Sequence, residues 1–325
     1  MLVLALVGDG SADPRDVLGY GQPPLIPPFL AEVDLWLGDT ACEACYGQLD
    51  GADPLADLLP DLPVGRWPAK TVEDVTALIA KQHRYATAPW GAWQSTVGSV
   101  ADNAEGALDF PQLAAQSEAV YPITMTLHRA YYDPQATSAD PAWYEAHARA
   151  VRERVLAIWQ AGAVLMQYTG HSHAYQWAVT DPRIEPRGLL DLNAVGDLRN
   201  GERLPLLLAL TCLTSAFHQP SPRGTTLDEA LVLHPDGGAL ATWGSSGLGV
   251  AHGHDHLQHG LVTAAMTLPR PTLGQMTEAG VLELAITGQC CIDALRTMLL
   301  LGNPATVLRV SPTPQRVWLP LVGRE

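Results

Sequence analysis

Two apolar stretches of this chain, residues 164–170 and 204–211, each lead directly into a reactive side chain. The first stretch ends in Gly170 and delivers His171, and the second delivers Cys212, 41 positions later. Apolar runs of this length, bounded by turn residues, predict buried strands. In open α/β sheets the ligand crevice lies outside the carboxyl ends of the strands. We therefore expect His171 and Cys212 at one edge of a sheet, which is the layout of a cysteine hydrolase.

Predicted strands and helices alternate along the whole chain, which is typical of an α/β fold with a parallel sheet and helices on both of its faces. Thr71, with Asp74 three residues later, predicts the capped start of a helix. The expected strands are residues 2–7, 62–67, 95–100, 123–127, 164–170, 204–211 and 237–243. The expected helices are residues 71–85, 110–119, 141–161, 189–198, 226–234, 257–267, 273–287 and 291–301.

The length of 325 residues fits one large domain or two smaller ones, and 47% apolar residues suffice for a sizeable core. The clearest break in composition is the segment 86–89. We predict a smaller N-terminal α/β subdomain over residues 1–88, which is incomplete if the chain is a fragment, a catalytic domain over 89–311, and a C-terminal tail or linker over 312–325.

The net charge of −15 argues against nucleic acid and anionic membranes as partners, because both require a basic surface. The apolar runs are of strand length, so we expect no membrane span. Residues 1–7 lack the positive start of a signal peptide and lead into a loop, so they are interpreted as a core strand.

Five cysteines leave at least one thiol unpaired. Cys42 and Cys45 are spaced as a small disulfide or half of a metal site, and coincidence is an equal alternative. Cys290 and Cys291 lie in a helical pattern, which favours a packing role.

A cysteine is nucleophilic as the thiolate, so Cys212 needs a base or cation beside it. His171 is the best placed base, because the ends of neighbouring strands lie about 5 Å apart. The backbone N–H groups of Ser172 and Cys212 are candidates to stabilise an oxyanion. The competing interpretation is that Cys212 is only a small buried apolar residue.

The segment from Tyr168 to Ser172, followed by Trp177, resembles the catalytic-histidine motif of the gingipain-type cysteine peptidases. Residues 210–217, with Phe217 five positions after Cys212, are similar to the nucleophile motif of that family. Further segments follow in family order at residues 6–11, 46–47, 64–66, 101–103, 237–241 and 301–305.

This resemblance implies a caspase-like fold and endopeptidase activity through a Cys212–His171 dyad, with no metal in the chemistry. The implied substrate is a peptide or protein. The resemblance also implies a secreted or cell-surface protein with additional domains outside this chain, since members carry further strands before the segment that begins this chain. Ser172 stands where the family usually has glycine, and residues 95–99 offer no acidic partner for the histidine.

The resemblance also implies an acidic residue in the S1 pocket shortly after residues 101–103. Asp109 is the nearest match and Glu105 is its competitor, and either would favour Arg or Lys at P1. The alternative for Asp109 is a helix cap. In the substrate-binding region, Trp243 and Ser245 are expected to form a wall of the same pocket, and Trp177 to pack beside the histidine.

Two other functions stay open. The fold is also compatible with a peptidase-like binding module that no longer turns over. A zinc hydrolase would use the histidines that crowd one stretch, His252, His254, His256 and His259. No cofactor is expected for the chemistry. Structural Ca²⁺ is allowed by the resemblance, with solvated turn carboxylates as the alternative for Asp50, Asp53, Asp57 and Asp61.

Overall fold

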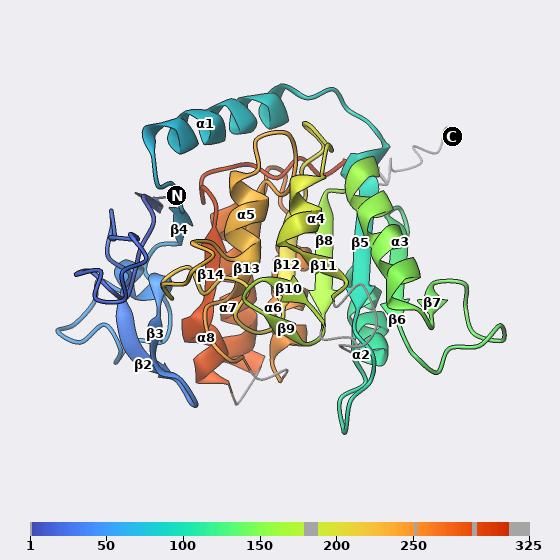
Figure 1. Ribbon diagram of the computed structural model, residues 1–325, viewed down its shortest axis with the longest axis horizontal. Helices are drawn as coiled ribbons and strands as arrows, with labels where there is room; N and C mark the ends of the chain where they lie inside the picture. Colours follow the sequence, from blue (N-terminus) through green and yellow to red (C-terminus); the bar gives the residue numbers. More distant parts are fainter. Residues whose placement is uncertain (1, 179–187, 250–251, 288–290, 312–325) are drawn as a thin grey trace, which may run out of the picture.

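The computed structural model describes residues 2–178, 188–249, 252–287 and 291–311, which fold around one nine-stranded sheet (Figure 1). The strand order is β1-β4-β14-β13-β12-β8-β5-β6-β7. Every neighbouring pair is parallel except β13 and β14, so β1, β4 and β14 run opposite to the other six. The strands are β1 (Leu4–Val7), β4 (Val64–Trp67), β5 (Thr96–Ala101), β6 (Thr126–Tyr132), β7 (Tyr144–Glu145), β8 (Leu165–Thr169), β12 (Leu206–Leu210), β13 (Ala241–Ser245) and β14 (Met298–Leu301).

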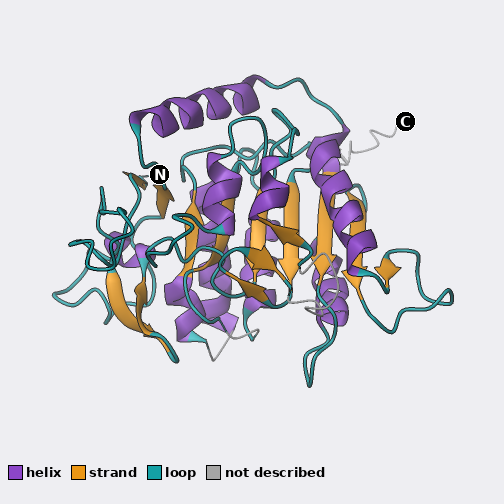
Figure 2. Cartoon of the chain, in the orientation of Figure 1, coloured by secondary structure: helices purple, strands orange, loops and turns teal. Residues whose placement is uncertain are grey.

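Helices cover both faces of this sheet, as Figure 2 shows, which confirms the predicted fold class. The α-helices are α1 (Val72–Thr87), α2 (Phe110–Ser117), α3 (Ala148–Ala161), α4 (Leu192–Gly196), α5 (Leu227–Leu233), α6 (His254–Thr267), α7 (Leu273–Thr287) and α8 (Ile292–Thr297). Short 3₁₀ helices span Glu43–Gly47, Ala92–Ser95 and Glu118–Val120. Two small sheets complete the fold, the hairpin of β2 (Leu30–Asp34) and β3 (Gly38–Ala41), and a ribbon of β9 (Ser172–His173), β10 (Gln176–Trp177) and β11 (Leu190–Asp191).

The apolar sequence of β12, and the largely apolar start of β8, follow from burial on both faces. Successive residues of a strand point to opposite sides. Leu165 and Leu208 therefore join the core against α6 and α7, whereas Met166 and Leu207 join the core against α3, α4 and α5. Gln167 of β8 is polar and fully buried, and its side-chain oxygen accepts hydrogen bonds within the core.

Most predicted elements are present, and the capping box of Thr71 and Asp74 at the start of α1 is confirmed. The predicted helix 291–301 is wrong in its second half, where Met298–Leu301 forms β14 between β13 and β4. The predicted helix 141–161 begins only at Ala148, and the preceding residues include β7. The predicted strand 237–243 begins at Ala241, because Gly238 adopts a left-handed turn with φ of +74°. The strand predicted at 123–127 spans Thr126–Tyr132 instead.

The proposed subdomain 1–88 contributes β1 and β4 to the same sheet through β14. The boundary at residue 88 stays a prediction, and the predicted tail 312–325 lies outside the described residues. Within the described ranges, no helix is both long and apolar enough to cross a membrane.

Arg66 of β4 holds the N-terminal segment together from inside the protein. Its guanidinium is fully buried and binds the Glu43 carboxylate at 2.7 Å. It also donates to the carbonyl oxygens of Gly8 at 2.7 Å and Ile26 at 3.1 Å. The same group lies 4.7 Å from the ring centroid of Phe217, in the segment that follows Cys212. Arg66 therefore connects the loop after β1 with the loop that carries the predicted nucleophile.

Candidate active site

The carboxyl ends of β8 and β12 place both residues of the predicted dyad at one edge of the sheet. The two strands are parallel neighbours, and Thr169 pairs with Leu210 as the last matched residues. His171 and Cys212 each stand two positions beyond that pair. The sequence prediction that both residues leave one edge of the sheet from adjacent strands is therefore confirmed.

Side-chain hydroxyls connect the two loops directly. The Thr211 hydroxyl lies 2.6 Å from the carbonyl oxygen of Gly170 and 2.6 Å from the Ser172 hydroxyl. Ser172 in turn donates to the carbonyl oxygen of Cys212. The serine that replaces the usual glycine of the motif thus connects the histidine loop to the cysteine loop.

The histidine loop requires glycine at position 170, because the neighbouring side chains leave no room there for a Cβ atom. A Cβ at Gly170 would lie 2.4 Å from Asp102 Cβ and 2.6 Å from the Tyr168 hydroxyl. Such distances are far below van der Waals contact, so any larger residue would displace the histidine loop.

The imidazole of His171 has contacts on two sides. Its Nε2 lies 3.1 Å from Glu105 Oε2, and its ring packs edge-on against Phe110 with centroids 4.9 Å apart. Its backbone N–H donates to Asp102 Oδ2 at 3.2 Å. Burial raises the pKa of Asp102 to about 6, against the opposing effect of backbone hydrogen bonds from Asn103 and His171. The side chain of His171 is still 41% exposed, so one part of the ring remains accessible to a substrate.

Cys212 is the free cysteine among the described residues, and it is partly buried. Its Sγ lies 3.7 Å from the carbonyl oxygen of Gly249. Leu213, directly after it, adopts a left-handed φ of +59°, which is uncommon for a branched residue and turns the chain sharply. The Leu213 N–H donates to the carbonyl oxygen of Gly247 at 3.0 Å. The loop after β13 therefore runs alongside the loop that carries Cys212.

Asp34, at the end of β2, also contacts the loop after β13. It is buried, and its Oδ2 accepts the N–H of Leu248 at 2.5 Å. A Cβ at Gly247 would lie 2.2 Å from the same oxygen, so the loop needs glycine there. Burial raises the pKa of the Cys212 thiol, and the negative charge of Asp34 raises it further.

Replacing Asp34 with Asn should make the Cys212 thiolate form at lower pH. The substitution removes the charge that opposes ionisation, so the pKa of Cys212 moves down towards its ordinary value. The pH dependence of the rate of alkylation by iodoacetamide measures this pKa. Asp39→Asn, an exposed change on the same hairpin, serves as the control. A profile that is identical in the Asp34 variant and the parent protein would exclude this electrostatic role.

The residues predicted to bind substrate differ in how exposed they are. Asp109 is exposed and caps α2, because its Oδ1 accepts the N–H of Gln112 at 2.9 Å. The alternative interpretation as a helix cap is thus confirmed, and its role in the pocket stays a prediction. Trp243 and Ser245 are buried, and Ser245 Oγ lies 3.1 Å from the Gly247 carbonyl oxygen. Trp177 is buried and stacks on Tyr168, with ring centroids 4.4 Å apart. In this structure none of these three side chains offers surface to a substrate.

The histidines of the 252–259 stretch point to different surroundings. His254 is buried, and burial lowers its pKa to about 4. His256 Nδ1 lies 2.9 Å from the Thr287 hydroxyl, and His259 Nδ1 lies 3.3 Å from Glu283 Oε1. Over the described ranges, no three His, Cys, Asp or Glu side chains are arranged to hold a metal ion.

The aspartates considered for Ca²⁺ do not fit a shared site. Asp53 and Asp57 each accept a backbone N–H two residues on, and Asp61 accepts that of Leu49. Their oxygens therefore serve their own loops, as expected for turn carboxylates. No step of the chemistry is assigned to an ion here.

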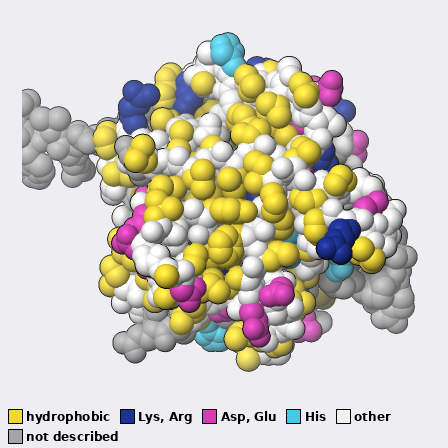
Figure 3. Space-filling model, turned by 90° about the vertical axis from the view of Figure 1, so that its left-hand side faces the viewer, with side chains coloured by type: hydrophobic (Ala, Val, Ile, Leu, Met, Phe, Trp, Pro, Cys, Tyr) yellow, Lys and Arg dark blue, Asp and Glu magenta, His cyan; other side chains and the backbone are white. Residues whose placement is uncertain are grey.

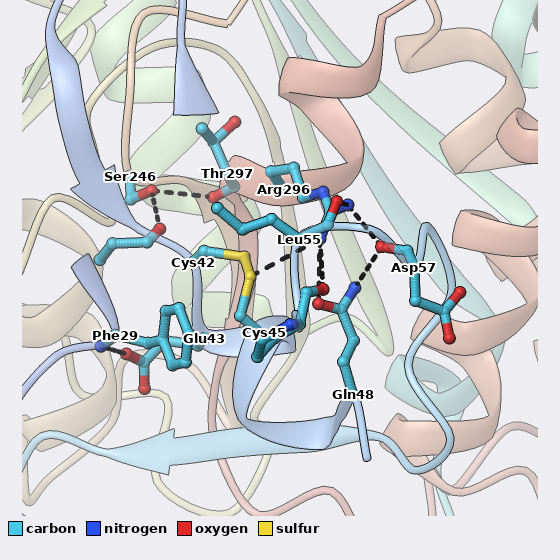
Figure 4. Close-up of a disulfide and its surroundings, with 12 residues drawn as sticks. Phe29, Cys42, Glu43, Cys45, Gln48, Leu55, Asp57, Ser246, Arg296 and Thr297 are labelled. Atoms are coloured by element: carbon cyan, nitrogen blue, oxygen red, sulfur yellow. Dashed lines mark hydrogen bonds between the residues drawn. A yellow bond between two sulfur atoms is a disulfide. The ribbon is translucent and has the colours of Figure 1, made fainter. Parts of the chain in front are cut away.

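Cys42 and Cys45 form a disulfide, so the first of the alternatives for this pair is the observed one (Figure 4). The buried guanidinium of Arg296 lies beside it, 3.7 Å from Cys45 Sγ and 3.0 Å from Gln48 Oε1. The Ser246 hydroxyl donates to the Ala41 carbonyl oxygen at 2.7 Å. The disulfide region thus supports the loop after β13. Cys291, predicted as a packing residue, is also disulfide-bonded, and Cys290 lies outside the described residues.

Sequence reasoning missed two acidic residues of this site. The sequence suggests Glu105 only for the S1 pocket, and residues 95–99, within β5 and just before it, contain no acidic partner for the histidine. Since β5 is the parallel neighbour of β8, the loop that follows β5 emerges beside His171, and strand order would have pointed to Glu105. Asp34 had no such signal, because it reaches the site from a separate hairpin.

Comparison with known proteins agrees with this geometry. The sequence model of peptidase family C25 matches residues 2–309. Among curated proteins no match is found. The structure is similar to the Arg-specific cysteine proteinase gingipain R (RgpB), with a TM-score of 0.67 at 18% identity, covering 95% of this chain and 65% of that one.

It is also similar to the complex of Porphyromonas gingivalis RgpB pro- and mature domains, with a TM-score of 0.69 at 17% identity. That match covers 95% of this chain and 66% of the other, so the chain spans slightly less than two thirds of the length of these structures. The family match covers nearly all of the described fold and both predicted motifs. This chain belongs to peptidase family C25.

Proposed function

We propose that this protein hydrolyses peptide bonds, with Cys212 as nucleophile and His171 as general base. The observation that carries the proposal is the placement of a free thiol and a half-exposed imidazole at matched positions beyond two adjacent parallel strands. Membership of a peptidase family supports the same reaction.

The contact between His171 and Glu105 supports an assignment of roles to the two imidazole nitrogens. Glu105 Oε2 lies 3.1 Å from Nε2, and in the proposed mechanism Nε2 carries the proton that faces this carboxylate, so that Nδ1 has the free lone pair. A carboxylate that holds the imidazole in one tautomer orients the base and stabilises the imidazolium that forms. We assign Nδ1 as the atom that takes the thiol proton.

The raised pKa of Cys212 means that the thiol is the resting form. His171 therefore removes the proton as sulfur attacks the scissile carbonyl carbon. The C–N bond then breaks, and the imidazolium returns the proton to the leaving amine. Water, deprotonated by the same imidazole, hydrolyses the thioester and restores the thiol. Backbone N–H groups of Ser172 and Cys212 are proposed to bind the oxyanion.

A basic P1 residue is the proposed specificity. The Arg-specific activity named for gingipain R supports it, as does the net charge of −15. Because Glu105 contacts the histidine, Asp109 is the remaining candidate of the two acids for binding the P1 cation.

Replacing Asp109 with Asn should reduce cleavage after Arg and Lys relative to neutral residues. Asn is an equally good helix cap, so α2 is retained while the charge is lost. We expect kcat/KM for basic P1 residues to fall about tenfold, equivalent to about 1.4 kcal/mol. A peptide library that varies only P1 measures the effect. An unchanged P1 preference would remove Asp109 from the pocket.

A cleavage profile and a covalent probe test the proposal as a whole. The protein should cleave a peptide library, and a peptide chloromethylketone should block cleavage by attaching to Cys212, as located by mass spectrometry. Loss of cleavage with a chelator, with no effect of the probe, would instead favour a metal hydrolase. A folded protein that cleaves no peptide in the library would favour a binding module.

A further inference from the structure

We propose that the turn of the β2–β3 hairpin, formed by Leu35, Trp36 and Leu37, is a binding surface for the peptide substrate beside Cys212. The partner that fits is a peptide segment that carries an apolar side chain next to a basic one. This inference rests on the proposed function and adds a substrate-recognition element to it.

A short series of contacts connects the residue before this turn with the loop beside Cys212. Asp34, the residue before the turn, accepts the N–H of Leu248. Gly249 follows Leu248, and its carbonyl oxygen lies 3.7 Å from Cys212 Sγ. In Figure 1 the turn between β2 and β3 lies towards the bottom, as do the carboxyl ends of β8 and β12. The hairpin therefore flanks the loop that contacts the nucleophile.

The turn exposes three large apolar side chains in succession. Leu35 is 75% exposed, Trp36 60% and Leu37 42%. Asp34 Oδ1 accepts the backbone N–H groups of Trp36 at 2.9 Å and Leu37 at 2.8 Å, so the backbone is held while the side chains face solvent. Figure 3, which views the side of the molecule that carries the N-terminal segment, shows hydrophobic side chains over much of that face. Contiguous exposed apolar surface on a soluble protein marks an interaction site.

An acidic pair on the hairpin, next to the turn, indicates that the partner is positively charged. Glu32 and Asp39 stand directly opposite each other across the hairpin, and both are exposed. Like charges in this arrangement are destabilising. A basic side chain between the two carboxylates would relieve the repulsion.

A peptide substrate can supply both an apolar and a basic side chain at this location. Its scissile carbonyl must reach Cys212, so the flanking residues run along the rim of the same edge of the sheet. An extended chain advances about 3.3 Å per residue, which lets successive side chains contact different parts of the rim. A fixed apolar turn with carboxylates behind it offers one contact for each of two such side chains.

The test compares two tryptophans of equal exposure. Trp90 is 61% exposed and lies away from the active site, with its ring 4.8 Å from the Arg309 guanidinium. We expect Trp36→Ser to lower kcat/KM about fivefold or more for peptides with an apolar residue at one defined position, mainly through KM. Trp90→Ser should leave the profile unchanged. Equal profiles for Trp36→Ser and the parent protein, or equal losses for both variants, would overturn the proposal.

The charge of the hairpin is tested separately. The double variant Glu32→Gln, Asp39→Asn should lower kcat/KM for peptides with a basic residue next to the apolar one, and the loss should shrink as salt is added. A loss that is the same for basic and neutral peptides would contradict the role assigned to the pair.

Two controls separate this inference from the proposed function. The rate at which iodoacetamide alkylates Cys212 should be the same in Trp36→Ser and the parent protein, because the thiol itself is not changed. If the parent protein cleaves no peptide, the proposed function fails, and peptide binding to the Cys212→Ala protein is measured with and without Trp36→Ser. Equal binding would then overturn the inference. A parent protein whose mass in solution is that of a dimer, reduced to a monomer by Trp36→Ser, would assign the turn to a second copy instead and would also overturn it.

Discussion

Cys212→Ala is expected to abolish peptide cleavage while leaving the fold intact. In the proposed mechanism this side chain supplies the nucleophilic sulfur. The nearby hydroxyls are engaged elsewhere, because Thr211 contacts Gly170 and Ser172, and Ser215 donates to the buried Asp228 carboxylate at 2.6 Å. Removal of a catalytic nucleophile typically costs about 10⁶-fold in kcat, so we expect a loss of at least about a thousandfold.

Steady-state cleavage of the best library peptide measures this loss, and the peptide chloromethylketone should no longer attach. Circular dichroism and urea midpoints show whether the variant is folded. Substantial residual cleavage by a folded Cys212→Ala protein would rule out the thiol mechanism.

His171→Ala is expected to lower kcat strongly as well, while the thiol remains available to small alkylating reagents at high pH.

Arg66→Ala is expected to destabilise the protein by about 3–5 kcal/mol, because it leaves a buried carboxylate without its partner. Glu43 is 2% exposed in its side chain, and the guanidinium that neutralises it is fully buried. The carbonyl oxygens of Gly8 and Ile26 lose a donor at the same time. Equilibrium unfolding in urea at pH 7 measures the change.

The loss of unfolding free energy in Arg66→Ala should grow as pH rises, because the folded and unfolded variants bind different numbers of protons. Burial already raises the pKa of Glu43, and removal of Arg66 raises it further. The folded variant then binds more protons than the unfolded chain, so its unfolding free energy falls as pH rises through that pKa. Replacing the pair by Arg66→Met with Glu43→Gln should recover most of the stability. The partly exposed pair of Arg154 and Glu145 is the control, since Arg154→Ala should cost only about 0–1 kcal/mol. Equal losses for the two arginines would contradict the argument.

Much of the fold was predictable because the pattern of the sequence is local. The apolar runs before His171 and Cys212 have the length of buried strands, and caps such as Thr71 mark where helices begin. The run from Met298 to Leu301 was misassigned because leucines after a helical pattern suit a helix and a buried strand equally. This segment is a strand because it pairs with β13 and β4, whose residues lie more than fifty positions away in the sequence.

The α/β class, the family, and the two strands that end in His171 and Cys212 follow from the amino-acid sequence alone, because alternation, strand length and motif spacing are properties of neighbouring residues. The folded structure is needed to show that Glu105 contacts the imidazole of His171, that Asp34 contacts the loop beside Cys212, and that an apolar hairpin flanks this loop. These contacts join segments far apart in the chain. Their formation depends on strand order and on how loops pack at one edge of the sheet, which no local pattern specifies.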